Sequence, residues 1–86
     1  MGKVVALFKV FPEDMKYFDR IKEEIAKKHN PSHIDSEPVA FGFNVMKVTF
    51  LREDSSGGAA EFDRLEQEIA KIKGVSSVEI ADMGRL

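Results

Sequence analysis

Residues 33–51, HIDSEPVAFGFNVMKVTFL, contain two extended stretches on either side of Gly42. In the second stretch Met46, Val48 and Phe50 recur at every second position, which is the spacing of residues on one face of a β-strand. Glycine adopts backbone conformations that other residues avoid, so Gly42 suits a turn. These residues predict two consecutive strands joined at Gly42.

The segment before this pair predicts a strand followed by a helix. Residues 3–11, KVVALFKVF, place Val4, Ala6, Phe8 and Val10 on one face of a strand. Pro12 ends that strand, and Asp14 can cap the next element. Phe18, Ile21 and Ile25 then recur at helical spacing, so we expect a helix that ends near His29.

The segment after the pair repeats this plan in the order helix, strand. Residues 53–58, EDSSGG, are a polar turn, and the next stretch carries an apolar helical stripe that closes at Gly74. VSSVEIADM then gives a last strand through Val78 and Ile80. The order βαββαβ predicts one domain over residues 1–86 with an α+β, ferredoxin-like sandwich, in which two helices cover one face of a four-stranded antiparallel sheet. The stripe consists of Phe62, Leu65, Ile69 and Ile72.

The other face of such a sheet has no helix over it. The alternation places apolar residues there as well, which indicates either a partner surface or the scattered apolar exposure that small sheets tolerate. The sequence leaves both explanations open. These residues are Val5, Leu7 and Phe11 of the first strand and Val45, Thr49 and Leu51 of the third.

Composition excludes several classes of protein. The 86 residues hold 13 Lys and Arg against 15 Asp and Glu, a formal charge of -2, so there is no basic field for nucleic acid. Cysteine is absent, which excludes disulfides, thiolate nucleophiles and iron–sulfur clusters. No apolar run is long enough to span a membrane. We expect a cytoplasmic protein that binds neither nucleic acid nor membrane directly.

Catalytic and metal-binding motifs are weak. His29 and His33 are four residues apart, with Asp35 and Glu37 nearby, but Asn30-Pro31 breaks the helix that would align the histidines on a metal. A solvated loop is therefore the expectation here. There is no nucleophile elbow and no phosphate-binding loop. We expect no covalent chemistry, and so neither an enzyme nor a cofactor.

An RNA-binding module is the alternative function. Residues 40–48, AFGFNVMKV, resemble the RNP1 motif of RNA-recognition domains, which have the same βαββαβ order and stack aromatic rings on single-stranded bases. The match is poor, because Val39 and Ala40 replace the basic residue, Asn44 replaces valine, and the motif straddles two strands. A small-ligand regulatory domain of this topology is a third possibility.

Three blocks resemble one family. Residues 1–14, MGKVVALFKVFPED, residues 37–48, EPVAFGFNVMKV, and residues 74–86, GVSSVEIADMGRL, are together similar to archaeal elongation factor 1-beta, the nucleotide exchange factor of the translation elongation GTPase. The resemblance covers essentially the whole chain. It implies a cofactor-free monomer that docks on elongation factor 1-alpha, in its GDP-bound and nucleotide-free forms, and speeds GDP release by weakening GDP–magnesium binding.

The resemblance also implies which residues act. It places Phe41 at the interface as an aromatic anchor and Arg85 as the exchange-promoting cation near the magnesium site. Gly42, Met83 and Leu86 are assigned as further partner contacts.

The sequence departs from the eukaryotic relatives at two places. They have lysine at the position of Arg85, and arginine keeps the charge but prefers bidentate partners. They also have a lysine pair where this chain has Asn44 and Val45. Lys9 and Lys47 are candidates to supply that charge.

Overall fold

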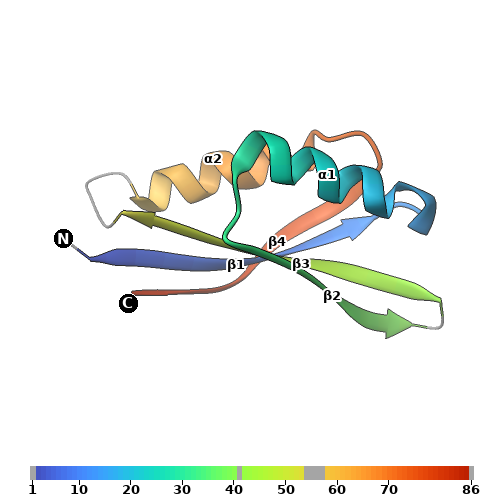
Figure 1. Ribbon diagram of the computed structural model, residues 1–86, viewed down its shortest axis with the longest axis horizontal. Helices are drawn as coiled ribbons and strands as arrows, with labels where there is room; N and C mark the ends of the chain where they lie inside the picture. The colour runs from blue at the N-terminus through green and yellow to red at the C-terminus, as the bar shows by residue number, and fades with distance from the viewer. Residues whose placement is uncertain (1, 41, 54–57, 86) are drawn as a thin grey trace.

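Two helices lie across one face of a four-stranded antiparallel sheet whose strand order is β2-β3-β1-β4 (Figure 1). The computed structural model describes residues 2–40, 42–53 and 58–85. The predicted ferredoxin-like βαββαβ sandwich is confirmed. Its elements are β1 (Lys3–Pro12), a 3-10 turn η1 (Met15–Tyr17), α1 (Phe18–His29), β2 (His33–Ala40), β3 (Phe43–Glu53), α2 (Gly58–Ala70) and β4 (Val75–Arg85).

The core fills the space between the sheet and the helices. Every second residue of the central strand β1 is buried, as the alternation predicts. The Phe8 ring lies at the centre, in edge-to-face contact with Phe50 at 5.1 Å and with Phe62 at 6.2 Å between ring centroids. These contacts join β1, β3 and α2. The buried cluster also includes Val4, Ala6, Val10, Ile21, Ile25, Met46, Val48, Leu65, Ile69, Ile72 and Val75.

Both ends of the first helical segment follow the sequence signals. The Asp14 carboxylate accepts a hydrogen bond from the Lys16 backbone N–H at 3.0 Å, which caps η1. Helix α1 ends at His29, and Asn30 takes the left-handed conformation with φ 49°. Asparagine tolerates that conformation, and Pro31 cannot continue a helix.

The second helix ends earlier than predicted. It stops at Ala70 instead of running to Gly74. The chain tightens into i to i+3 hydrogen bonds, including Ile72 N–H to the Ile69 carbonyl at 3.1 Å, which keeps Ile72 in the core. Gly74 then turns the chain into β4 with φ +98°, where a Cβ would lie 2.7 Å from the Tyr17 ring. A side chain is excluded there by both conformation and space.

The last strand is longer than predicted and carries a β-bulge. It continues to Arg85, and the register with β1 shifts between Leu7 and Phe8, so that Ala81 is an extra residue opposite that step. Directly paired residues of antiparallel strands point to the same face. Met83 and Arg85, opposite Ala6 and Val4, therefore face the helix side.

Candidate functional site

The β2–β3 turn is one end of the candidate site. Ala40 pairs with Phe43, so residues 41–42 alone connect the two strands. Gly42 has φ +74°, a conformation that favours glycine, which confirms that it provides the turn. Phe41 lies outside the described residues. Nearby Val39 is 51% exposed, so an apolar side chain is accessible to solvent at this end of the sheet.

A methionine supports the base of this turn. The Asn44 backbone N–H points at the Met15 sulfur at 3.3 Å, which joins the start of β3 to η1. Thioether sulfur is a weak acceptor, so this contact orients the turn more than it stabilises it.

The end of β4 is the second part of the candidate site. Arg85 is exposed and pairs with Val4, and Val4 pairs on its other side with Arg52 of β3. Arg52, Val4 and Arg85 thus form one row across the sheet. Met83 is 43% exposed two residues before Arg85, and Leu86 lies outside the described residues.

The two predicted ends lie far apart. Figure 1 shows the C-terminus at one end of the long axis and the β2–β3 turn at the other. Between Gly42 and Arg52 the chain rises about 3.3 Å per residue, or about 33 Å in all. The longest dimension of the molecule is 41 Å. One partner must therefore span most of the sheet to contact both ends.

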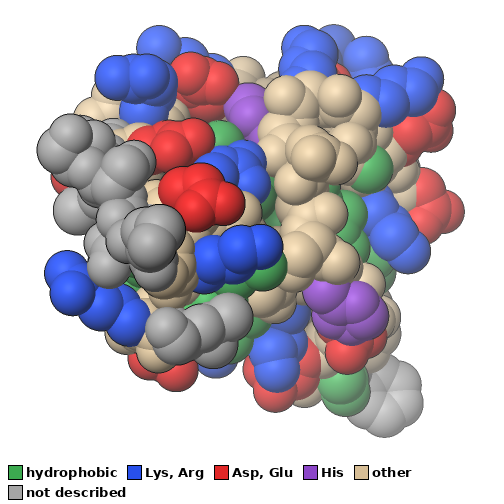
Figure 2. Space-filling model, turned by 60° about the vertical axis from the view of Figure 1, so that its left-hand side comes forward, with side chains coloured by type: hydrophobic (Ala, Val, Ile, Leu, Met, Phe, Trp, Pro, Cys, Tyr) green, Lys and Arg blue, Asp and Glu red, His purple; other side chains and the backbone are tan. Residues whose placement is uncertain are grey.

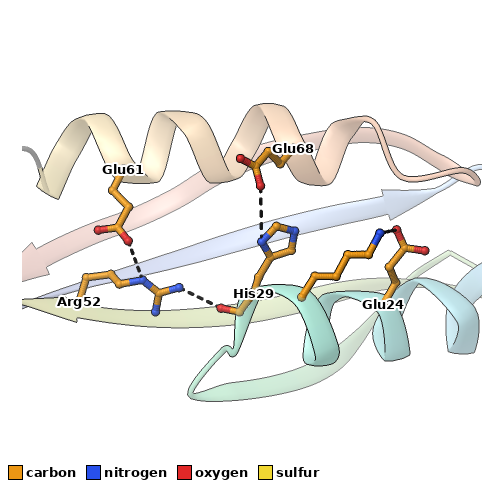
Figure 3. Close-up of polar contacts among 6 residues, drawn as sticks. Glu24, His29, Arg52, Glu61 and Glu68 are labelled. Carbon is orange, nitrogen blue, oxygen red and sulfur yellow. Dashed lines mark hydrogen bonds and ion pairs between the residues drawn. The ribbon is translucent and has the colours of Figure 1, made fainter.

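Arg52 is a site-adjacent residue that sequence reasoning did not single out. Its guanidinium donates to Glu61 of α2 at 3.1 Å and to the His29 carbonyl at the end of α1 at 2.9 Å (Figure 3). His29 in turn faces Glu68 of α2, with 3.8 Å between Nδ1 and Oε1. These contacts connect both helices to β3 in the row that contains Arg85. No local pattern reveals them, because the partners are 9 and 23 residues away.

Charged and apolar residues share the open face. Lys9 and Lys47 lie directly opposite each other, and the Glu37 carboxylate is 3.9 Å from each ammonium group. One carboxylate thus offsets the repulsion of two facing cations. Val45, expected on the bare face, is completely buried, although it lies outside the main core. The open face is therefore less apolar than the sequence suggested.

The possible metal ligands do not come together. His29 faces Glu68 of α2, whereas His33, Asp35 and Glu37 lie on β2, the first of the two predicted strands, so the solvated-loop expectation is wrong for these three residues. Within residues 2–40, 42–53 and 58–85, no three His, Asp or Glu side chains are grouped closely enough to hold a metal ion.

Among the described residues, the middle of the open face lacks the aromatic rings of an RNA platform, although Phe11 of β1 and Phe43 of β3 are partly exposed. Bases stack on exposed aromatic rings of the two central strands. Here the middle of β1 and β3 carries Leu7, Lys9, Lys47 and Thr49 on that face. Figure 2, which brings the left-hand side of Figure 1 forward and does not show the open face, has acidic and basic side chains mixed over its surface.

Comparison with known proteins identifies the family. Residues 5–86 match the model of the EF-1 guanine nucleotide exchange domain. The chain belongs to the elongation factor 1-beta family. The elongation factor 1-beta of Methanothermobacter thermautotrophicus is 36% identical, with 100% of this chain and 99% of the relative aligned. Those of Staphylothermus marinus and Natronomonas pharaonis are 34% and 32% identical, again over 100% of this chain.

Family membership agrees with the predicted class of function. Elongation factor 1-beta is an exchange factor of translation elongation, and its exchange domain accounts for nearly all of this chain. The relatives are aligned over 99% or 100% of their own length. Among the described residues, none of the helices has the length and apolar character needed to cross a membrane.

Proposed function

We propose that this member of the elongation factor 1-beta family acts as a single cytoplasmic domain over residues 1–86. It docks as a monomer on the elongation GTPase, elongation factor 1-alpha, and promotes exchange of GDP for GTP by weakening GDP–magnesium binding. The match of residues 5–86 to the exchange domain is the observation that carries this proposal. Neither a cofactor nor covalent chemistry is needed.

The turn between β2 and β3 supplies the docking anchor. A two-residue turn with Gly42 at positive φ projects from the end of the sheet, and Phe41 is its other residue. Aromatic side chains that enter a partner pocket commonly provide a large part of the binding energy. The exposed Val39 side chain extends the apolar contact around this anchor.

The end of β4 supplies the exchange-promoting cation. GDP affinity rests on magnesium and on backbone groups that surround the phosphates, so a competing positive charge at that site weakens the nucleotide. The strand ladder with β1 holds the Arg85 backbone in place. A guanidinium carries its charge at all physiological pH values, so it competes as a permanent cation.

Because the β2–β3 turn and the end of β4 are far apart, we assign them different functions: the turn provides affinity, and the end of β4 promotes exchange. Along β3, Gly42 of the turn lies about 33 Å from the row that contains Arg85, so an anchor at the turn supports affinity without contact to the nucleotide. Accelerating GDP release about a thousandfold requires about 4 kcal/mol of differential stabilisation. By linkage, a protein that weakens GDP binding must itself bind the GDP form more weakly than the empty form, by the same factor. Affinity for the nucleotide-free GTPase is therefore the stronger of the two.

Release of a fluorescent GDP analogue tests this function. The analogue is loaded on elongation factor 1-alpha, and its release is followed by stopped flow with increasing amounts of this protein. We expect a release rate that rises and then saturates. A rate that stays at its intrinsic value, with a GTPase that binds nucleotide normally, would overturn the proposal.

A further inference from the structure

A small hollow lies on the open face near the end of β4. It has a volume of about 120 Å³ and is lined by Val5, Leu7, Asp82 and Gly84, which face the open side, and by Met83, which lies between the last two along the strand. An apolar cavity of about 150 Å³ holds one benzene molecule, so this hollow is large enough for one aliphatic side chain. It lies on the opposite face from Arg85, because Gly84 pairs with Val5 whereas Arg85 pairs with Val4.

Gly84 keeps this hollow open. Its φ is outside the left-handed region, and a Cβ built there would have nothing within 4 Å. The fold of this chain therefore does not require glycine at this position. A larger side chain would point to the same face as Val5 and fill the hollow. Because residue 84 is glycine, the hollow has room for a group of atoms from another molecule.

Asp82 gives the hollow a charged rim. It pairs with Leu7 and so faces the open side, and its carboxylate accepts a hydrogen bond from the Met83 backbone N–H at 2.9 Å. No ion pair between described residues neutralises Asp82. An apolar floor beside an acidic rim complements an aliphatic side chain that lies next to a cation.

We propose that the hollow receives one aliphatic side chain of the elongation GTPase, presented next to a lysine or arginine that pairs with Asp82. This inference rests on the proposed function and adds a third contact to it. Strand β4 is at the edge of the sheet, so a partner can contact both of its faces.

Calorimetric titration onto nucleotide-free elongation factor 1-alpha tests the proposal without relying on exchange. Gly84→Leu fills the hollow and should weaken binding about tenfold or more, as expected for blocking a buried anchor. Asp82→Asn should weaken binding about threefold and reduce its salt dependence, because a charge pair is lost. Ala26→Leu adds the same side chain to an exposed site on α1 and should leave affinity unchanged.

Three results separate this inference from the proposed function. If a folded Gly84→Leu protein bound the GTPase as tightly as the parent, the proposal for the hollow would be wrong. The proposed exchange function would still stand. If the parent binds the GTPase without accelerating GDP release, the proposed exchange function is wrong. The affinities of the variants then still test whether the hollow receives a side chain of the GTPase. If the parent does not bind the GTPase, both proposals fail. If melting curves show that Gly84→Leu does not fold, Gly84→Ala and Asp82→Asn replace it in the titration. Unchanged affinity for the GTPase in both variants would then overturn the proposal for the hollow.

Discussion

Arg85 lies directly opposite Val4 in the β1–β4 ladder, in the same row as Arg52 of β3. Two inter-strand spacings of about 4.8 Å separate the backbones of the two arginines by about 10 Å. A residue one position from the end of the chain would ordinarily fray into solvent. Here the ladder with β1 reaches it, so the backbone that carries the proposed exchange-promoting cation has a defined position.

Phe41→Ala should weaken docking and leave the fold intact. The ring is proposed to enter a pocket on the GTPase, and removing such an anchor commonly costs more than 1 kcal/mol, or about tenfold in the half-saturating concentration for GDP release. The maximal release rate should change little. Titrated stopped-flow release and a thermal melt measure the two quantities.

A core substitution provides the contrast for Phe41. Phe50→Leu removes part of a completely buried ring that contacts Phe8, so it should lower stability and leave docking unchanged. If Phe41→Ala behaved in this way, with a large loss of thermal stability and normal exchange, Phe41 would be a core residue and not an anchor.

Gly42→Ala should destabilise the protein by about 1 kcal/mol, because alanine pays a steric cost at positive φ. A Cβ at this position would meet nothing within 4 Å, so the cost is conformational and not a clash. Urea unfolding measures the change. Gly84→Ala is the matched control, since its Cβ also enters open space at an ordinary φ. Equal stability of the two variants would refute a strained turn.

Arg52→Ala should cost about 1 to 2 kcal/mol of unfolding free energy, because charged hydrogen bonds to Glu61 and to the His29 carbonyl are lost from a site where the side chain is 21% exposed. Arg52→Lys should restore only part of the lost unfolding free energy, since one ammonium group cannot bond both partners as the forked guanidinium does. Urea unfolding again measures both.

Lys27→Ala is the control for Arg52. It removes a well-exposed ion pair with Glu23, four residues earlier on α1, and should cost less than about 0.5 kcal/mol. If Arg52→Ala cost no more than Lys27→Ala, Arg52 would not connect the two helices to the sheet.

Local patterns predicted most of the fold. The alternation in β1, the Asp14 cap and the Asn30-Pro31 stop each act within a few residues, and all three lie where the sequence signals place them. The early end of α2 and the length of β4 were not predicted. Helix α2 gives way to i to i+3 hydrogen bonds that keep Ile72 in the core, and the length of β4 reflects the pairing of Arg85 with Val4, so both depend on contacts between distant parts of the chain.

Sequence patterns predicted less of the candidate site than of the fold. Periodicity alone gives Phe41 no role beyond a turn and gives Arg85 none at all, so the family resemblance supplied both. The bulge at Ala81 decides which face each later residue of β4 occupies. Strict alternation from Ile80 would put Asp82 and Gly84 on the helix side, away from Val5 and Leu7, so the sequence pattern alone does not predict the hollow.

The most direct test of the central claim is the maximal rate of GDP release from elongation factor 1-alpha at saturating concentrations of the parent protein and of Arg85→Ala, in the presence of magnesium. We predict that the parent accelerates release, and that the variant saturates at a rate at least about tenfold lower with nearly the same half-saturating concentration, which corresponds to about 1.4 kcal/mol of lost stabilisation. Equal maximal rates would contradict the account and remove Arg85 from the mechanism.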